Sequence, residues 1–311
     1  MTDIDLQQPE FNTPPAVIAG YYADPNLTIF DGRYYLYPTT DGLEGWRATS
    51  FRAFSSRDLS TWTDHGEIFS LTDVDWASEH AWAPTVARRG DSFYLYFTAE
   101  NNIGVAVADS PVGPFVDLGR PLIRDGEFSG RSIDPSVFVD VDDTPYLYWG
   151  NTVAHGVPLN DDMVSFDPAR VVSWKPTGFR EAAWVHEREG TYYLSWSEND
   201  TREADYRVRY ATSSSALGPW TDRGILLEKL PERGILATGH HSILRIPDSD
   251  EWLIAYHRFA IPGGSGYRRE VVIDRLDHSA DGLLQRVIPA QETLSRRLSH
   301  HPKIDQDHQE R

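Results

Sequence analysis

Five copies of one short strand pattern recur along this chain, and three of them begin with a carboxylate. Asp24 opens DPNLTIFDGRYYLYPTTD, Asp134 opens DPSVFVDVDDTPYLYWGN, and Glu181 opens EAAWVHEREGTYYLSWSEN. Each copy is a short apolar run, a polar turn and an aromatic-rich run with alternating faces, which predicts a β-hairpin. Two further copies open without an acid, at Ala83 and at His240.

The spacing of these copies constrains the fold. They begin at positions 24, 83, 134, 181 and 240, and each is followed by further strand-like segments, most loosely in the third copy. Strand repeats of this length are typical of a β-propeller, in which the first strand of every blade lines the central channel. We therefore predict an all-β, five-bladed β-propeller with four antiparallel strands per blade. Helix content should be low, because no window keeps apolar residues at helical spacing.

The 311 residues fit one domain. We predict that the propeller spans residues 14–296 and carries the catalytic site, between a polar N-terminal tail at 1–13 and a polar C-terminal tail at 297–311. No linker rich in Pro, Gly or Ser indicates a second domain. The sequence leaves the oligomeric state open.

The charge balance restricts the classes of molecule that this protein can bind. The chain has 29 Lys and Arg against 47 Asp and Glu, a net charge of −18. Such a surface repels phosphate backbones and anionic membranes, so we expect no nucleic-acid and no membrane partner. A polyanionic substrate is disfavoured unless a local basic patch exists. A neutral oligosaccharide substrate remains.

Cysteine is absent, which excludes disulfides and thiolate chemistry. The N-terminal residues MTDIDLQQPEFNTPP are acidic and polar where a signal peptide would be basic and then apolar. No run of about 18 apolar residues occurs. We expect a cytoplasmic protein.

Since the first strands of all blades face one channel, the three acids should meet in one pocket. Hydrolysis of a glycosidic bond needs an acid that protonates the leaving oxygen and a base that activates water, and two carboxyls commonly supply them. We assign Asp24 as the base, Glu181 as the acid, and Asp134 as the group that tunes and orients Glu181. A single Asp-Pro is common at strand starts. Three acids at equivalent positions of three blades favour catalysis.

Several aromatic residues are candidates for substrate binding. Trp82, just before the second-blade strand, is predicted to stack on a sugar face, with a core role as the alternative. Trp46 and Trp149 are further candidates, although most of the ten Trp residues of a propeller should pack between blades.

Three polar residues near the end of the chain are also candidates. His240 opens the fifth blade and should face the channel, where it either holds water or a cation or is a hydrogen-bonded core histidine. Alternation allows only one of Arg268 and Arg269 to face the pocket, and we favour Arg269.

Together these motifs resemble glycoside hydrolase family 43, five-bladed propeller enzymes that remove arabinose or xylose from plant polysaccharide fragments. The matching segments are ADPN at 23–26, WAP at 82–84, IDPS at 133–136, Glu181 ahead of GTYYLSWS, and TGHHS at 238–242. The resemblance implies the same three acid roles, inversion at the anomeric carbon, and no cofactor for the chemistry. It further implies that His240 contributes to a calcium or water site in the channel, and that the region of Arg269 binds substrate.

The chain departs from the family at two points. The family's general acid is commonly followed by Gly-Pro, whereas Ala182 and Ala183 follow Glu181 here, and the family's frequent C-terminal β-sandwich has no counterpart in the 311 residues. The related invertase-like family would show NDPNG, RDP and Glu-Cys instead.

The sequence favours an exo-acting α-L-arabinofuranosidase of hemicellulose fragments. A β-D-xylosidase is the second interpretation and a galactofuranose-cleaving enzyme the third. A non-catalytic carbohydrate-binding propeller is the alternative of another class, but lectin propellers usually repeat one binding motif in every blade, and here the acids differ between blades. The sugar, the linkage and exo or endo action stay open.

Overall fold

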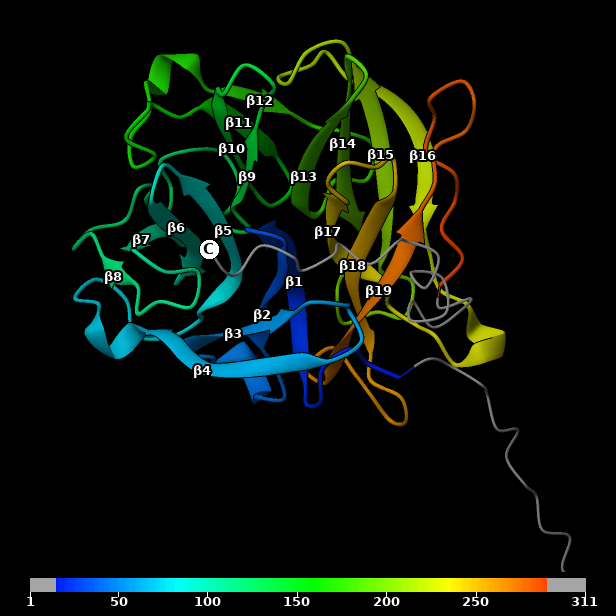
Figure 1. Ribbon diagram of the computed structural model, residues 1–311, viewed down its shortest axis with the longest axis horizontal. Coiled ribbons are helices and arrows are strands. Elements are labelled where there is room, and N and C mark those ends of the chain that lie inside the picture. The colour runs from blue at the N-terminus through cyan, green and yellow to red at the C-terminus, as the bar shows by residue number, and fades with distance from the viewer. Residues whose placement is uncertain (1–14, 290–311) are drawn as a thin grey trace, which may run out of the picture.

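The computed structural model describes residues 15–289, which form a closed ring of five antiparallel sheets around a channel (Figure 1). The predicted all-β, five-bladed propeller is confirmed. The predicted tails at 1–13 and 297–311 lie outside the described residues. Within the described part of the chain, no helix is long and apolar enough to cross a membrane.

Four sheets contain four strands each, connected in chain order. The first holds β1 (Tyr22–Phe30), β2 (Arg33–Thr40), β3 (Ser50–Ser56) and β4 (Trp62–Ser70). The second holds β5 (Trp82–Arg89), β6 (Ser92–Ala99), β7 (Asn102–Ala108) and β8 (Val116–Asp117). The third holds β9 (Ser136–Val139), β10 (Pro145–Trp149), β11 (Ala154–Pro158) and β12 (Val172–Trp174). The fourth holds β13 (Glu181–Arg188), β14 (Thr191–Glu198), β15 (Arg207–Ser213) and β16 (Thr221–Leu227).

The fifth sheet contains three strands among the described residues. They are β17 (Gly239–Arg245), β18 (Trp252–Phe259) and β19 (Arg269–Leu276). The four helical elements between residues 15 and 289 are short 3-10 turns, which confirms the predicted low helix content. They are η1 (Glu44–Trp46), η2 (Leu71–Asp73), η3 (Pro168–Arg170) and η4 (Pro231–Arg233).

The ring closes through the segment that precedes β1. The backbone N–H of Val17 donates to the carbonyl of Val271 in β19, at 3.0 Å, so this segment lies beside the outer strand of the fifth sheet. The chain after β19 runs instead toward the fourth sheet, where Val287 N–H donates to the carbonyl of Leu226, at 2.8 Å. Both ends of the described chain thus join neighbouring blades.

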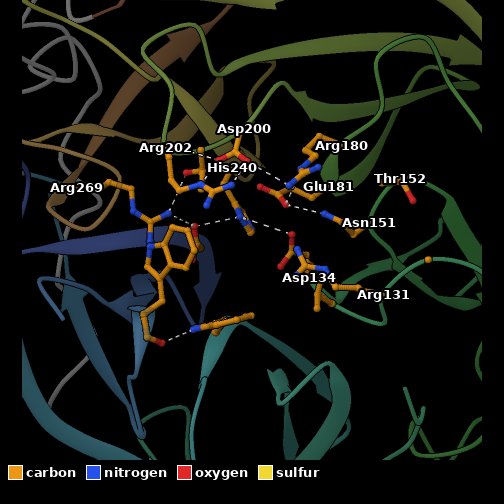
Figure 2. A pocket seen from close by; sticks show the side chains of 16 residues that line it. Arg131, Asp134, Asn151, Thr152, Arg180, Glu181, Asp200, Arg202, His240 and Arg269 are labelled. Atoms are coloured by element: carbon orange, nitrogen blue, oxygen red, sulfur yellow. Dashed lines mark hydrogen bonds and ion pairs between the residues drawn. The ribbon is translucent and has the colours of Figure 1, made fainter. Parts of the chain in front are cut away.

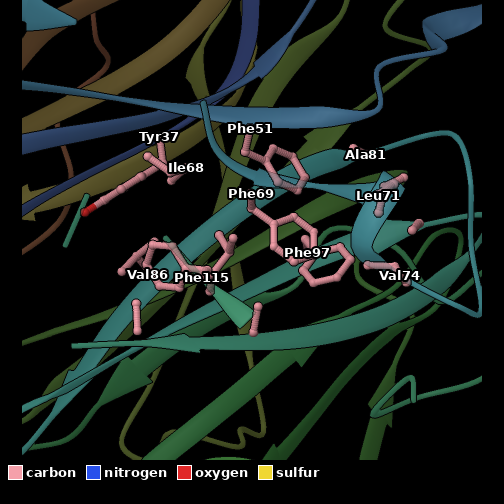
Figure 3. Close-up of a cluster of buried hydrophobic side chains, with 14 of the residues drawn as sticks. Tyr37, Phe51, Ile68, Phe69, Leu71, Val74, Ala81, Val86, Phe97 and Phe115 are labelled. Atoms are coloured by element: carbon pink, nitrogen blue, oxygen red, sulfur yellow. The ribbon is translucent and has the colours of Figure 1, made fainter. Parts of the chain in front are cut away.

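Apolar side chains pack between adjacent sheets and fix the blades against each other. Figure 3 shows the core between the first two blades, where Phe51, Phe69 and Phe97 meet. The rings of Phe69 and Phe97 lie 4.7 Å apart, and all three side chains are almost fully buried. Since a close-packed core resists displacement, it holds the strand ends at the channel in place.

The start of each first strand has an unusual backbone. One residue per blade takes a positive φ, and a bulge follows in four of the five strands. These residues are Asp24, Ala83, Asp134, Ala182 and His240, with φ between 42° and 60°. Such conformations cost about 1–3 kcal/mol for a non-glycine residue and persist where surrounding contacts hold them.

Side chains of the preceding blade hold four of these backbones. The acceptors are His257 Nδ1 for the N–H of Asp24 at 3.2 Å, Thr39 Oγ1 for Ala83 at 2.7 Å, Thr98 Oγ1 for Asp134 at 2.9 Å, and Ser197 Oγ for His240 at 2.9 Å. All four acceptors lie in the second strand of their blade, β2, β6, β14 or β18. The strand starts are therefore linked around the ring.

Glu181 does not occupy the position equivalent to Asp24 and Asp134, and this part of the prediction is wrong. In the hairpin register Glu181 pairs with Ser197 as Ala23 pairs with Thr39, so that Ala182 is the counterpart of Asp24. The same bulge follows in both strands, so it does not cause the offset. Glu181 takes the place of Ala23, and the fourth repeat aligns with the first on Ala182.

Candidate active site

A pocket of about 480 Å³ lies at the end of the channel where the first strands begin. Asp24, Asp134 and Glu181 all line it, and so do four of the other predicted site residues, Trp46, Trp82, His240 and Arg269. Figure 2 shows Asp134, Glu181, His240 and Arg269 turned toward one another. Below Asp24 and Asp134 the channel narrows to a cavity of about 20 Å³, which has room for water but not for a sugar, so for a sugar the pocket is blind.

One side of the pocket surrounds Asp24 with basic groups, and we call Asp24, Asp41, His240, His257 and Arg269 the Asp24 wall. The Oδ1 atom of Asp24 lies 3.1 Å from His240 Nδ1, 3.1 Å from His257 Nδ1 and 3.4 Å from Arg269 Nη1. These residues come from the first and fifth blades, which the ring places side by side (Figure 1).

This environment keeps Asp24 ionised. Burial opposes the charge, but the cations of His240 and Arg269 outweigh it and hold the pKa of Asp24 well below its usual range. Burial also opposes the charge of His240, but Asp24 and Asp134 raise its pKa to about 9. Burial, together with the charge of Arg269, lowers the pKa of His257 to about 3, so this imidazole stays neutral. An ionised, buried carboxylate suits a general base.

Asp41 fixes the position of Arg269. Its buried Oδ2 atom accepts from the backbone N–H of Arg269, at 3.0 Å, and from Nε, at 2.8 Å. With the backbone and the Nε held, Nη1 reaches Asp24 and also donates to Thr201 Oγ1, at 3.2 Å. Asp41 therefore acts on the base through Arg269.

The other side of the pocket binds Glu181 with neutral donors, and we call Asp134, Asn151, Glu181 and Tyr206 the Glu181 wall. Asn151 Nδ2 donates to Glu181 Oε2 and the Tyr206 hydroxyl donates to Oε1, each at 2.9 Å. Arg180 is the nearest cation, with its Nε 3.9 Å from Oε2. Both carboxyl oxygens are thus oriented at a pocket surface that is largely buried.

Asp134 is the member of the Glu181 wall that comes near the Asp24 wall. Its Oδ2 atom is 3.9 Å from His240 Nδ1, and its backbone is held by Thr98. Burial raises the pKa of Asp134 to about 7, and the nearby charges of Glu181 and Asp24 add to this effect. Near neutral pH the carboxyl of Asp134 is therefore partly protonated.

The two tryptophans that line the pocket support each other. Trp82 Nε1 donates to the carbonyl of Trp46, at 2.6 Å, and Trp46 Nε1 donates to the carbonyl of Gly266, at 2.8 Å. Their rings meet edge to face, 6.4 Å apart. The faces they present at the pocket suit contact with a sugar ring.

Trp149 was predicted to bind substrate, and the structure places it elsewhere. Its side chain is fully buried, and it packs against Phe128 and His155 in the core of the second and third blades. Alternation along β10 turns Trp149 into the sheet interface. Of the two arginines, Arg269 is buried at the pocket as predicted, and Arg268 is exposed.

His240 faces the channel as predicted, but its surroundings do not form a metal site. Within residues 15–289 no three His, Asp or Glu side chains are arranged to hold a metal ion. The Nδ1 atom of His240 points at Asp24 and Asp134, and calcium binds roughly six to eight oxygen ligands, which the side chains gathered here do not supply. The side chains present therefore do not fit calcium.

Sequence reasoning missed Asp41, Asn151, Tyr206 and His257. Asp41 and Asn151 follow a second strand, and His257 lies near the end of one. In a hairpin the end of the second strand lies beside the start of the first, so polar residues there belong to the same pocket. The signals were TTD at 39–41 for Asp41, GN at 150–151 for Asn151, and AYHRF at 255–259 for His257. No comparable signal singles out Tyr206.

An ionised carboxylate fixed among cations, with a second carboxyl held by neutral donors in the same pocket, is an arrangement that general acid–base catalysis can use. Comparison with known proteins gives the class. Residues 13–284 match the family described as glycosyl hydrolases family 43, and the chain belongs to this family of glycoside hydrolases.

Relatives and solved structures agree with this assignment. A β-D-galactofuranosidase of Aspergillus niger is 33% identical, over 89% of this chain and 85% of its own. An arabinoxylan arabinofuranohydrolase of Bacillus subtilis is also 33% identical, over 89% of this chain and 64% of its own. A β-xylosidase/α-arabinofuranosidase from a compost metagenome, solved with xylotriose in a calcium-free form, superposes with a TM-score of 0.75 at 30% identity, over 90% of this chain and 98% of its own.

Proposed function

We propose that this protein is an inverting exo-α-L-arabinofuranosidase that releases terminal L-arabinofuranose from arabino- or arabinoxylo-oligosaccharides. The observation that carries the proposal is the contrast between the two walls of one blind pocket. Asp24, in the first blade, is ionised among cations. Glu181 lies in the fourth blade, which is not adjacent to the first, and is oriented by neutral donors.

In this mechanism each acid has a separate task. Asp24 takes a proton from water as the water attacks the anomeric carbon. Glu181 gives a proton to the departing glycosidic oxygen from the other side of the sugar. Asp134 supports Glu181 through its charge, and His240 links the two Asp residues. Family 43 enzymes invert the anomeric centre.

The stereochemical course tests the roles of Asp24 and Glu181. Inversion requires room for a water between base and sugar, which corresponds to carboxyls roughly 6.5–9.5 Å apart. Proton NMR of the first-formed sugar should show the inverted anomer. A retained anomer would contradict the assignment of Asp24 as a base.

The arabinofuranose specificity is supported by relatives. Besides the Bacillus subtilis enzyme, a solved α-L-arabinofuranosidase of Clostridium thermocellum is 32% identical, with a TM-score of 0.72 over 86% of this chain and 93% of its own. A β-D-xylosidase is the second candidate, because a Xanthomonas citri neighbour at 29% identity was solved with xylose. The Aspergillus niger relative makes galactofuranose the third.

Side-by-side kinetics with nitrophenyl α-L-arabinofuranoside, β-D-xyloside and β-D-galactofuranoside decide among these sugars. We expect the highest kcat/KM on the arabinofuranoside. A higher value on either other glycoside would replace the proposed sugar, and no hydrolysis of any would favour the non-catalytic, carbohydrate-binding alternative. None of the relatives described above is named as a binding protein.

Exo action is supported by the closed end of the pocket, where the channel narrows to about 20 Å³. This constriction suits a terminal sugar at the bottom of the pocket. We expect short oligosaccharides to be cleaved much faster than insoluble arabinoxylan, with monosaccharide as the first product. Chromatography of the early products checks this, and longer fragments appearing before the monosaccharide would indicate endo action.

A further inference from the structure

The pocket concentrates positive charge in a protein that is otherwise strongly negative. Four arginines and His240 line it, against four carboxyls, while the whole chain carries a net charge of −18. The arginines are Arg131, Arg180, Arg202 and Arg269. This is the local basic patch that the overall charge alone gave no reason to expect.

Two of these arginines are already neutralised. Arg269 is held by Asp41 and Asp24, and Arg202 forms an ion pair with Asp200, at 2.6 Å. Their charges serve the protein's own carboxylates. They leave little attraction for a charged ligand.

The other two arginines are available at the pocket surface. Arg131 is exposed, and it has no ion-pair partner within residues 15–289. Arg180 shares Asp200 with Arg202, at 3.3 Å, and its Nε makes no hydrogen bond but is buried, so only the exposed part of its side chain can meet a ligand. Its side chain is about one-third exposed, at 35%. Guanidinium groups with free N–H donors bind carboxylates with matching geometry.

Both available arginines lie on the side of the leaving group. Figure 2 shows Arg180 beside Glu181 and Arg131 beside Asp134, with Asn151 and Thr152 on the same side. Since Glu181 protonates the departing oxygen, the sugar attached to that oxygen must lie next to Glu181. Arg131 and Arg180 thus flank the part of the substrate that departs.

We propose that this site prefers substrates whose leaving group carries a carboxylate, such as a hexuronic acid next to the terminal sugar that is removed. The inference rests on the proposed glycosidase function and adds the chemical class of the leaving group. The carboxylate binds between Arg131 and Arg180 and forms charge-assisted hydrogen bonds. The negative surface elsewhere would keep long polyanions away, so short acidic fragments are the fitting substrates.

The test compares one disaccharide in two forms. The sugar preferred in the nitrophenyl assay is linked to glucuronic acid, as the free acid and as its methyl ester. The ester keeps the shape and removes the charge. At low ionic strength we expect kcat/KM about tenfold higher for the acid, and this ratio should approach one as salt screens the charges.

Variants of single arginines show which residue causes the preference for the acid over the ester. Arg131→Gln should remove most of the preference for the acid over the ester, and Arg131→Lys should keep part of it. Arg57→Gln, a change of the same charge at an exposed turn outside the pocket, should leave the ratio as in the wild type.

The outcomes separate the two proposals. Equal kcat/KM for acid and ester, or an Arg131→Gln enzyme with the full preference, would overturn the inference while leaving the glycosidase function intact. Failure to cleave the nitrophenyl glycosides as well as both disaccharides would overturn the proposed function, and this inference with it.

Discussion

The Asp24 wall and the Glu181 wall carry the same kind of functional group in opposite surroundings. Asp24 contacts two histidines and an arginine, whereas Glu181 is held by an amide and a phenol. Cations stabilise the carboxylate of Asp24, whereas burial raises the pKa of Asp134, in the Glu181 wall, to about 7, so that this wall holds a proton near neutral pH. The comparison shows that environment, more than residue type, divides the base from the acid.

Loss of the base should have the largest effect. Asp24→Ala removes activation of the water, which every substrate needs, so kcat should fall on the order of 10²–10⁴ on both oligosaccharides and dinitrophenyl glycosides. The control is Asp91→Ala at the exposed turn between β5 and β6. Full activity of Asp24→Ala on the activated glycoside would show that the Asp24 wall does not hold the base.

The effect of removing the acid on the rate should depend on the leaving group. Glu181→Ala should cost about 10²–10⁴ in rate on natural oligosaccharides, because a sugar alkoxide leaves poorly without a proton. Dinitrophenolate leaves readily, so much of the activity on a dinitrophenyl glycoside should remain. Equal losses on both substrate types, and equal to those of Asp24→Ala, would remove the distinction between the walls.

Removal of a cation from the Asp24 wall should raise the pKa of Asp24 and so reduce the electrostatic difference between the two walls. Arg269→Gln takes away a charge that keeps the pKa of Asp24 low, so this pKa should rise and the acidic limb of the kcat/KM profile should move up by about 1–3 pH units. The exposed neighbour gives the control, since Arg268→Gln should leave the limb in place. An unmoved limb in Arg269→Gln would show that His240 alone sets the charge of Asp24.

A substitution of Asp134 tests the electrostatics of the Glu181 wall. Asp134→Asn removes the negative charge that appears as the pH rises through about 7, so nothing then favours retention of a proton by the neighbouring acid. The alkaline limb of the profile should move to lower pH, by about one unit. The exposed turn residue Asp142, replaced by Asn, serves as control. A limb that moves to higher pH would contradict the tuning role.

The smallest effect should come from Asp41, which touches neither substrate nor water in this mechanism. Asp41→Asn keeps the shape but weakens the hold on Arg269, so the acidic limb should move up by less than in Arg269→Gln. Because Asp41 acts through Arg269, the double variant should shift no further than Arg269→Gln alone. Additive shifts would show that Asp41 acts by a separate route.

The fold was predictable because its signals are local. Each hairpin shows its own apolar alternation and turn, and five copies at similar spacing allow few architectures other than a propeller. Asp24, Asp134, Trp82 and His240 were found at the pocket for the same reason, since the start of a first strand must reach the channel.

The remaining site residues depend on contacts between blades. His257 reaches Asp24 across 233 positions of sequence, and Asp41 reaches Arg269 across 228. No pattern within one repeat encodes such pairs. Trp149 shows the opposite error, because a tryptophan at the end of an aromatic strand fits a pocket and a core equally well until the neighbouring blade is in place.

The sequence by itself determined that this chain builds five hairpin units and sends three acids to one end of a channel, because periodicity and strand direction are properties of each segment. Only the tertiary structure decided the chemistry of those acids. The hairpin register places Glu181 one residue before the position of Asp24, and the low pKa of Asp24 arises from charges that the fifth blade brings within 3.4 Å. Electrostatic interactions act through space, so they exist only once the ring has closed.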